Sequence, residues 1–159
     1  MIGELLVVAA CFAPPVDVPI AIGFARPACE YCPGHRGLEY HPPAGVPVHA
    51  VIAGVVSFAG RVAGTLYVVV AQGDGSRATY GMLLTRVVGD GDGVAAGQIV
   101  GYASARLYFG LRDPLDQPID PTGMLGRWVS RPRLLPVDGT RARAGPPPTL
   151  ACPAAADGR

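Results

Sequence analysis

Apolar and polar residues alternate through the middle of the chain, a pattern that predicts β-strands rather than helices. The clearest run is TLYVVVA at residues 65–71, which is almost wholly apolar, rich in β-branched residues and therefore typical of a central strand. The QGDG sequence at residues 72–75 follows it as a tight hairpin signal. Further strands are predicted over residues 48–51, 55–59, 77–84 and 107–112, with an exit turn at residues 119–121.

Turn-forming residues are frequent, and no long amphipathic helix pattern is present. The chain contains 22 glycines and 17 prolines, which favours many turns and few long helices. Residues 14–27 alternate apolar residues with prolines, which suits an edge strand because proline cannot donate to a central ladder. We therefore expect an all-β domain of roughly eight to ten antiparallel strands, folded as a sandwich or flattened barrel.

A single domain is expected for 159 residues, enough to bury a core. Composition divides the chain into a residual signal or lipoprotein segment at residues 1–13, a folded domain at residues 14–137, and a Pro-, Ala- and Arg-rich tail at residues 138–159. Residues 5–13 resemble the apolar core of an export signal, and the residues ending at Cys11 loosely fit a lipoprotein cleavage box. A buried first strand without any export role is the alternative. No transmembrane helix is expected, because spanning a bilayer takes about 20 apolar residues.

The formal net charge is only +1, so we expect no attraction to nucleic acid or to a membrane surface. All 13 basic residues are arginines, and lysine is absent. Five of these arginines lie at residues 127–143 beside a single acid, Asp138. That segment is expected to be a solvated surface wrap, with binding to an anionic wall polymer as the alternative.

Four cysteines favour an exported domain in an oxidising compartment. Cys11 and Cys152 flank the domain, so a disulfide between them would tie its two ends together. Cys29 and Cys32 could form a local disulfide. The alternative for this C-x-x-C pair, which His35 follows, is half of a zinc site, although no second C-x-x-C pair is present.

Candidate chemistry gathers in the sequence GHRGLEYH at residues 34–41. His35 and Glu39 are four residues apart, a spacing common among metal ligands. The intervening Gly37 and the Pro-Pro pair that follows argue against a helix, so this pair is expected on a turn and the start of a strand. Glu39 and His41 are two residues apart and would share one face of an extended segment.

This segment, together with AGVPVHAVIAGVVSFAG at residues 44–60 and GDGVAAGQIVG at residues 91–101, resembles the LytM/lysostaphin-type zinc metallopeptidases of the bacterial cell wall. The resemblance extends over roughly residues 24–135 and implies a LytM-like β-sandwich. It places the zinc ligands of the family at His35, Glu39 and Tyr108, and two catalytic histidines at Met82 and Arg106. The implied reaction is attack of a zinc-polarised water on a peptide bond of peptidoglycan.

Only His35 retains the residue type of the family. Glu39 replaces an aspartate, Met82 and Arg106 replace the catalytic histidines, and Tyr108 replaces the third zinc ligand. A tyrosine binds zinc only as a phenolate, which has an ordinary pKa near 10. A guanidinium beside the site opposes a divalent cation, and a thioether transfers no proton. We therefore expect no cofactor, with Zn²⁺ as the alternative.

The expected function is that of a secreted or cell-surface module that binds peptidoglycan or a cell-wall hydrolase without cutting it. The former substrate groove would carry the binding, with His41 and Tyr80 among its lining residues. In such an inactive site, Arg106 would form a salt bridge with Glu39, and His35 would hydrogen-bond to Glu39 or Tyr108.

Two alternatives stay open. One is an active zinc endopeptidase that uses His35, Glu39 and one of His41, His49 or Tyr108. The other is a structural wall protein whose pocket has no function.

Other functions are excluded by missing residues. Biotinyl and lipoyl carrier domains share part of this β motif but require a lysine for covalent attachment, and a Walker A phosphate loop requires one too. An EF-hand loop that began at Asp90 would end at Gly101, where a bidentate glutamate is needed.

Overall fold

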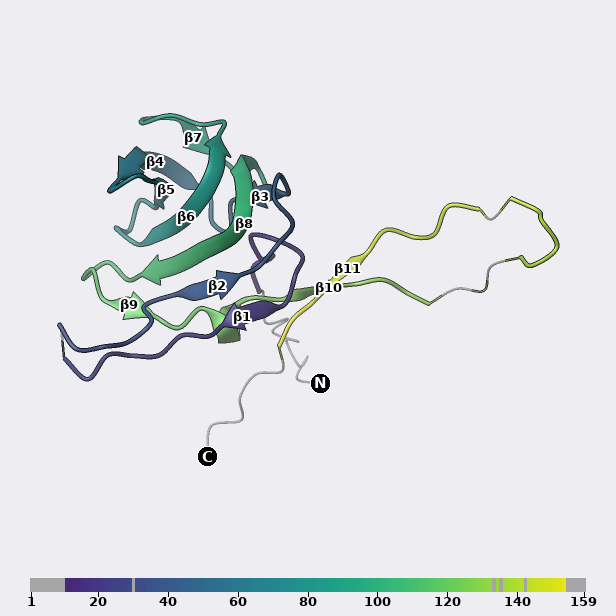
Figure 1. Ribbon diagram of the computed structural model, residues 1–159, viewed down its shortest axis with the longest axis horizontal. Coiled ribbons are helices and arrows are strands. Elements are labelled where there is room, and N and C mark those ends of the chain that lie inside the picture. The colour runs from purple at the N-terminus through teal and green to yellow at the C-terminus, as the bar shows by residue number, and fades with distance from the viewer. Residues whose placement is uncertain (1–10, 30, 133, 135, 142, 154–159) are drawn as a thin grey trace, which may run out of the picture.

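The computed structural model describes residues 11–29, 31–132, 134, 136–141 and 143–153 (Figure 1). This part of the chain contains short and long strands, one 3-10 turn, η1 (Thr122–Met124), and no α-helix. The strands are β1 (Ile20–Ile22), β2 (Leu38–Tyr40), β3 (Pro47–His49), β4 (Gly54–Val62), β5 (Thr65–Ala71), β6 (Arg77–Arg86), β7 (Gly93–Val94), β8 (Ile99–Arg112), β9 (Pro118–Ile119), β10 (Arg127–Val129) and β11 (Thr149–Ala151). The prediction of an all-β fold is confirmed.

Nine of these strands form one antiparallel sheet in the order β1-β2-β8-β6-β5-β4-β7. The two remaining strands of this sheet, β3 and β9, also pair with β8. The long strand β8 therefore pairs with four other strands, β2, β3, β6 and β9. Figure 1 shows that β6 and β8 bend strongly, so that the sheet curls around its own interior. The remaining strands, β10 and β11, form a separate two-stranded sheet.

Strand alternation places the core inside this curl. In β5, Leu66, Val68 and Val70 are buried, while the residues between them are partly exposed. In β8, Leu107 and Phe109 are completely buried and point to the same side. The opposite, outer face therefore carries Glu39 of β2 and Arg106 and Tyr108 of β8.

The pairing between β6 and β8 is interrupted in the middle. Gly81 pairs with Tyr108 and Leu83 with Ala103, so the residues between Ala103 and Tyr108 bulge out of the ladder. Opposite them, Met82 has a φ of 61°, in the left-handed region that residues with a side chain rarely adopt. Met82 and Arg106 both lie at this irregularity.

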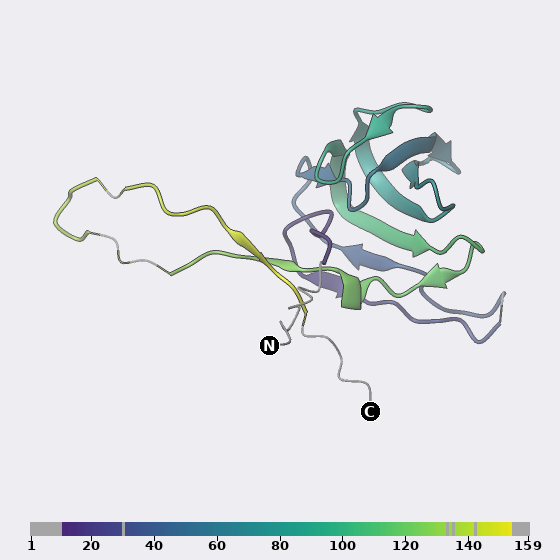
Figure 2. The ribbon, with the colours of Figure 1, turned by 180° about the vertical axis from the view of Figure 1, so that it is seen from behind.

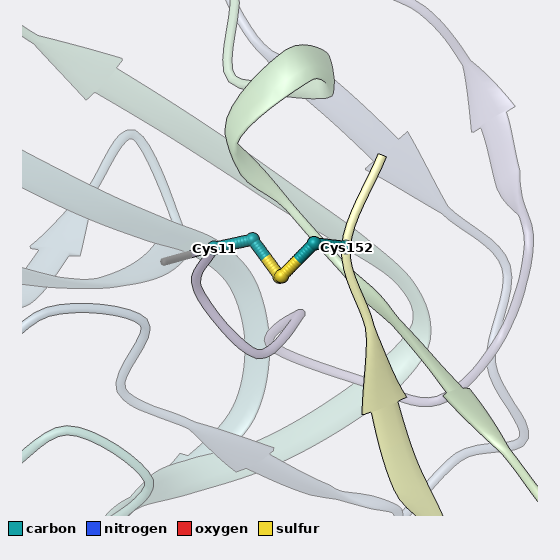
Figure 3. The surroundings of a disulfide bond; sticks show 2 residues. All are labelled: Cys11 and Cys152. Atoms are coloured by element: carbon teal, nitrogen blue, oxygen red, sulfur yellow. A yellow bond between two sulfur atoms is a disulfide. The ribbon is translucent and has the colours of Figure 1, made fainter. Parts of the chain in front are cut away.

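The strands β10 and β11 begin and end a long arm that projects from the sheet in both views (Figures 1 and 2). The described residues between these two strands are almost all exposed, including Leu134 and Val137. A disulfide joins Cys152, just after β11, to Cys11 (Figure 3). The predicted tail thus contains a strand, and its end is covalently linked to the start of the described chain.

The predicted strands differ from the observed ones mainly in length. The prediction for residues 65–71 matches β5 residue for residue. The last core strand begins at Ile99 rather than at residue 107, and of residues 14–27 only Ile20–Ile22 form a strand, β1, which lies at the sheet edge as expected. The expected signal or lipoprotein segment lies mostly outside the described residues. Within the described chain, no helix is long and apolar enough to cross a membrane.

Candidate functional site

Two of the candidate residues, Glu39 and Tyr108, lie in one row on the outer face of the sheet that runs across four neighbouring strands. Glu39 of β2 pairs with Tyr108 of β8, and Tyr108 pairs in turn with Gly81 of β6. Gly81 then pairs with Tyr67 of β5. This row brings together the family positions 39 and 108, which the sequence separates widely.

Two tyrosine rings lie flat on this face because glycines leave room beneath them. A Cβ on Gly37 would lie 2.8 Å from the Cε2 and Cζ atoms of Tyr108, and a Cβ on Gly81 would meet the ring of Tyr67. The sequence analysis did not select Tyr67. A signal was available, because Tyr67 alternates with the buried Leu66 and Val68 and must therefore face outward.

Glu39 is the one charged residue of the described chain that is buried, with only 4% of its side chain exposed. Its Oε1 accepts a hydrogen bond of 2.6 Å from Nε of Arg106 and one of 3.1 Å from Nε2 of His41. The Arg106 hydrogen bond holds the pKa of the Glu39 carboxyl below its ordinary value of 4.5, against the opposing effect of burial. The salt bridge expected between Arg106 and Glu39 is present in the structure.

His35 takes a different partner from the one expected. Its Nδ1 donates to the backbone oxygen of Gly23 at 3.0 Å, instead of bonding to Glu39 or Tyr108. The ring meets Tyr108 edge to face, with 6.0 Å between the ring centroids. This arrangement leaves Nε2 of His35 turned away from the backbone, in the tautomer that a metal-binding histidine would need.

Tyr80 was expected in the groove, and that expectation is wrong. The residue is completely buried, and its hydroxyl accepts a hydrogen bond of 2.7 Å from the backbone N–H of Val51. It faces the core because it shares the inward side of β6 with Ala78. Tyr80 therefore positions the strand that carries the site and does not reach the site.

The donors on the outer face do not fit a catalytic zinc site of the family type. Glu39 is occupied by two donors, and burial raises the pKa of the Tyr108 hydroxyl above its ordinary value of 10.0, so the phenolate is disfavoured. Arg106 places a positive charge directly on the acidic ligand position. In the described residues no three His, Cys, Asp or Glu side chains are grouped so that they could hold a metal ion.

The cysteines next to His35 are paired with each other. Cys29 and Cys32 form a disulfide, as Cys11 and Cys152 do, and no free cysteine is present among the described residues. The structure therefore differs from the alternative in which Cys29 and Cys32 supply half of a zinc site, because a disulfide sulfur is no zinc thiolate.

A pocket lies on the other side of β2. It has a volume of about 550 Å³ and is lined mainly by apolar residues, among them Val16, Tyr40 and Leu125. Tyr40 follows Glu39 in the strand, so its side chain points to the opposite face. This pocket is therefore separate from the outer face.

Comparisons with known proteins agree with this geometry. The sequence model of peptidase family M23 matches residues 33–121, more than half of the chain. A search of curated protein sequences found no significant match.

Solved structures of similar fold include Csd3 of Helicobacter pylori, at 25% identity and a TM-score of 0.63 over 73% of this chain. The chain covers only 34% of that protein. The catalytic domain of the prophage-encoded M23 protein EnpA from Enterococcus faecalis is 28% identical, with a TM-score of 0.55, 69% of this chain covered and 95% of that domain.

The catalytic domain of lysostaphin from Staphylococcus simulans shares the fold at 24% identity and a TM-score of 0.55, with 65% of this chain covered and 88% of that one. A chain of the SpoIIQ–SpoIIIAH pore-forming complex shares it too, at 18% identity and a TM-score of 0.62, with 74% of this chain and 92% of that chain covered. The resemblance to the lysostaphin-type peptidases that the sequence predicts is confirmed.

Proposed function

Since this chain belongs to peptidase family M23, we propose that it is a zinc-free, non-catalytic member that binds peptidoglycan, or a cell-wall hydrolase acting on it, through the outer face of its sheet. The observation that carries the proposal is the ion pair between Arg106 and Glu39. It occupies the acidic ligand position with a protein cation, and a Zn²⁺ ion would have to displace that cation.

The remaining family positions support the same conclusion. Met82 has no group that transfers a proton, and the Tyr108 hydroxyl, whose pKa burial raises above its ordinary value of 10.0, is protonated at neutral pH. General acid–base catalysis needs a group whose pKa lies near the working pH. Neither residue supplies one.

Export to the cell surface is part of the proposal. The two disulfides favour an oxidising compartment, where peptidoglycan is also accessible. Lipidation of Cys11 is not part of it, because the disulfide with Cys152 uses the same sulfur atom.

A second candidate is an active zinc endopeptidase with a rearranged ligand set. It is favoured by the orientation of His35, whose Nδ1 is held by Gly23 so that Nε2 is left for a metal. The contact of 3.1 Å between His41 and Glu39 would add a neighbouring donor if Arg106 moved away.

Metal content and wall binding separate the two candidates. We expect purified protein, prepared without chelators, to hold far less than one zinc per chain by elemental mass spectrometry. We also expect it to sediment with purified peptidoglycan without releasing soluble fragments. Zinc at near one per chain that is lost in His35→Ala, together with fragment release, would establish the enzyme instead. Failure to sediment with peptidoglycan would leave a hydrolase as the partner, to be sought by cross-linking at the outer face.

A further inference from the structure

Arg106 is anchored on one edge only. Its Nε donates to Glu39, while 57% of its side chain is exposed. No other described residue forms a hydrogen bond or ion pair with its two terminal nitrogens, Nη1 and Nη2. A guanidinium whose inner edge is fixed by a buried carboxylate presents its outer edge in a defined direction.

The surroundings favour an anion. Arginines lie near the ring of Tyr108: Arg106, whose Nε is paired with Glu39, and Arg112, which is paired with Asp116. Charges on Arg112 and Arg36 act on the Tyr108 hydroxyl, which places them near this ring. The exposed outer edge of the Arg106 guanidinium, next to these arginines, favours a negatively charged ligand.

The floor of this face is aromatic and flat. The rings of Tyr67 and Tyr108 lie next to Gly81 and Gly37, and both tyrosines are partly exposed. In the described part of the chain the Tyr108 hydroxyl has no hydrogen-bond partner, and it retains its proton to donate. Such a surface suits the backbone and small side chains of an extended peptide.

We propose that the outer face binds a peptide with a free carboxylate, and that Nη1 and Nη2 of Arg106 hold this carboxylate. The inference rests on the proposed function and names the group of the wall that is recognised. A guanidinium and a carboxylate then replace the metal ion and the scissile carbonyl as the central contact of the site. Recognition of a carboxylate gives the arginine at position 106 a role in binding, in addition to its ion pair with Glu39.

The test uses one ligand preparation in two chemical forms. Peptidoglycan fragments made soluble by a muramidase are divided, and in one half the peptide carboxylates are converted to methylamides. Binding of both halves to the full chain is measured by isothermal titration calorimetry. We expect the amidated fragments to bind about ten- to a hundredfold more weakly, the range for losing a charge-assisted hydrogen-bonded pair.

Variants locate the effect on the protein. Arg106→Gln should weaken binding of the free-carboxylate fragments by a similar factor and should no longer distinguish the two forms. Arg106→Lys retains the positive charge but lacks the planar guanidinium. Its affinity for the free-carboxylate fragments should therefore lie between those of wild type and Arg106→Gln. Arg127→Gln is the matched control, because Arg127 is an exposed arginine on β10, outside the nine-stranded sheet. Circular dichroism and thermal melting establish that each variant is folded.

Equal binding of free and amidated fragments by the wild-type chain would overturn the carboxylate proposal while leaving peptidoglycan binding intact. Unchanged discrimination in Arg106→Gln would overturn the assignment to Arg106 in the same way. If the wild-type chain bound neither form, the carboxylate proposal would fail together with peptidoglycan binding itself.

Discussion

Arg106 and Glu39 are joined by a hydrogen bond of 2.6 Å between Nε and Oε1, although 67 residues separate them in the sequence. Antiparallel pairing of β2 with β8 brings the two positions onto one face. Glu39 is buried and Arg106 is half exposed. Losing the ion pair would therefore leave the Glu39 carboxylate without a cation in the protein interior, whereas water could still solvate the Arg106 guanidinium. The ion pair thus links two strands at the place where a family member would hold its metal.

The first prediction concerns the pH dependence of stability. The folded pKa of Glu39 lies below its ordinary value of 4.5, chiefly because of the Arg106 hydrogen bond. The unfolded chain therefore binds this proton first as the pH falls, so the carboxylate stabilises the fold above about pH 4.5 and stops doing so as the pH drops through the folded pKa. Melting temperatures of wild type and Glu39→Gln should differ at pH 7, and the difference should shrink below pH 4.5.

An exposed carboxylate provides the control for this titration. Asp17→Asn removes an acid from the surface and should leave the melting temperature nearly unchanged across the same pH range. A gap between wild type and Glu39→Gln that stays constant down to pH 3 would contradict the ion pair as its source.

The second prediction restores the metal site. The combination Glu39→Asp, Met82→His, Arg106→His and Tyr108→His supplies, with His35, three zinc ligands and removes the competing cation. We expect this variant to bind close to one zinc per chain by elemental mass spectrometry after dialysis against a zinc buffer.

Tyr108→His alone is the matched control for that variant. It retains the pair between Arg106 and Glu39 and should therefore bind little zinc. A folded combined variant that still took up no zinc would mean that the strands, and not only the side chains, have moved away from the geometry of a metal site.

The third prediction separates the core from the binding face. Tyr80→Phe removes the acceptor of the Val51 N–H and leaves a buried donor without a partner, which costs about 1–3 kcal/mol of unfolding free energy. Urea denaturation should show this loss, while binding to peptidoglycan should be unchanged because Tyr80 has no exposed surface. Lost binding at full stability would instead mean that the hydrogen bond between Tyr80 and Val51 shapes the binding face from within the core.

Local pattern predicted the central part of the fold well. The strand Thr65–Ala71 is apolar, β-branched and bounded by glycine turns, so its ends could be predicted without tertiary information. The strand β8 was harder, because its residues bulge away from β6 opposite Met82 and the alternation breaks there. A periodicity argument stops at such a break, although the strand continues through it.

The sequence predicted most of the residues that form the site, but not all of the contacts that they make. A motif assigns a position to Tyr80 without saying which face it occupies, whereas the buried Ala78 two residues earlier would have indicated the core. The bond from His35 to Gly23 depends on how a loop folds back, which no spacing in the sequence encodes. Opposite charge and a shared face were enough to predict the pair between Arg106 and Glu39.

The last prediction compares the two disulfides. The chain-entropy model relates stabilisation to the length of the loop that a disulfide closes in the unfolded chain. The Cys11–Cys152 bridge spans 141 residues and the Cys29–Cys32 bridge only 3, which correspond to about 5 and about 2 kcal/mol respectively. Replacing Cys11 and Cys152 by serine should therefore lower the unfolding free energy, measured in urea, by about 3 kcal/mol more than replacing Cys29 and Cys32. Equal losses would contradict the chain-entropy account, because the loop closed in the unfolded chain would then not determine the stabilisation.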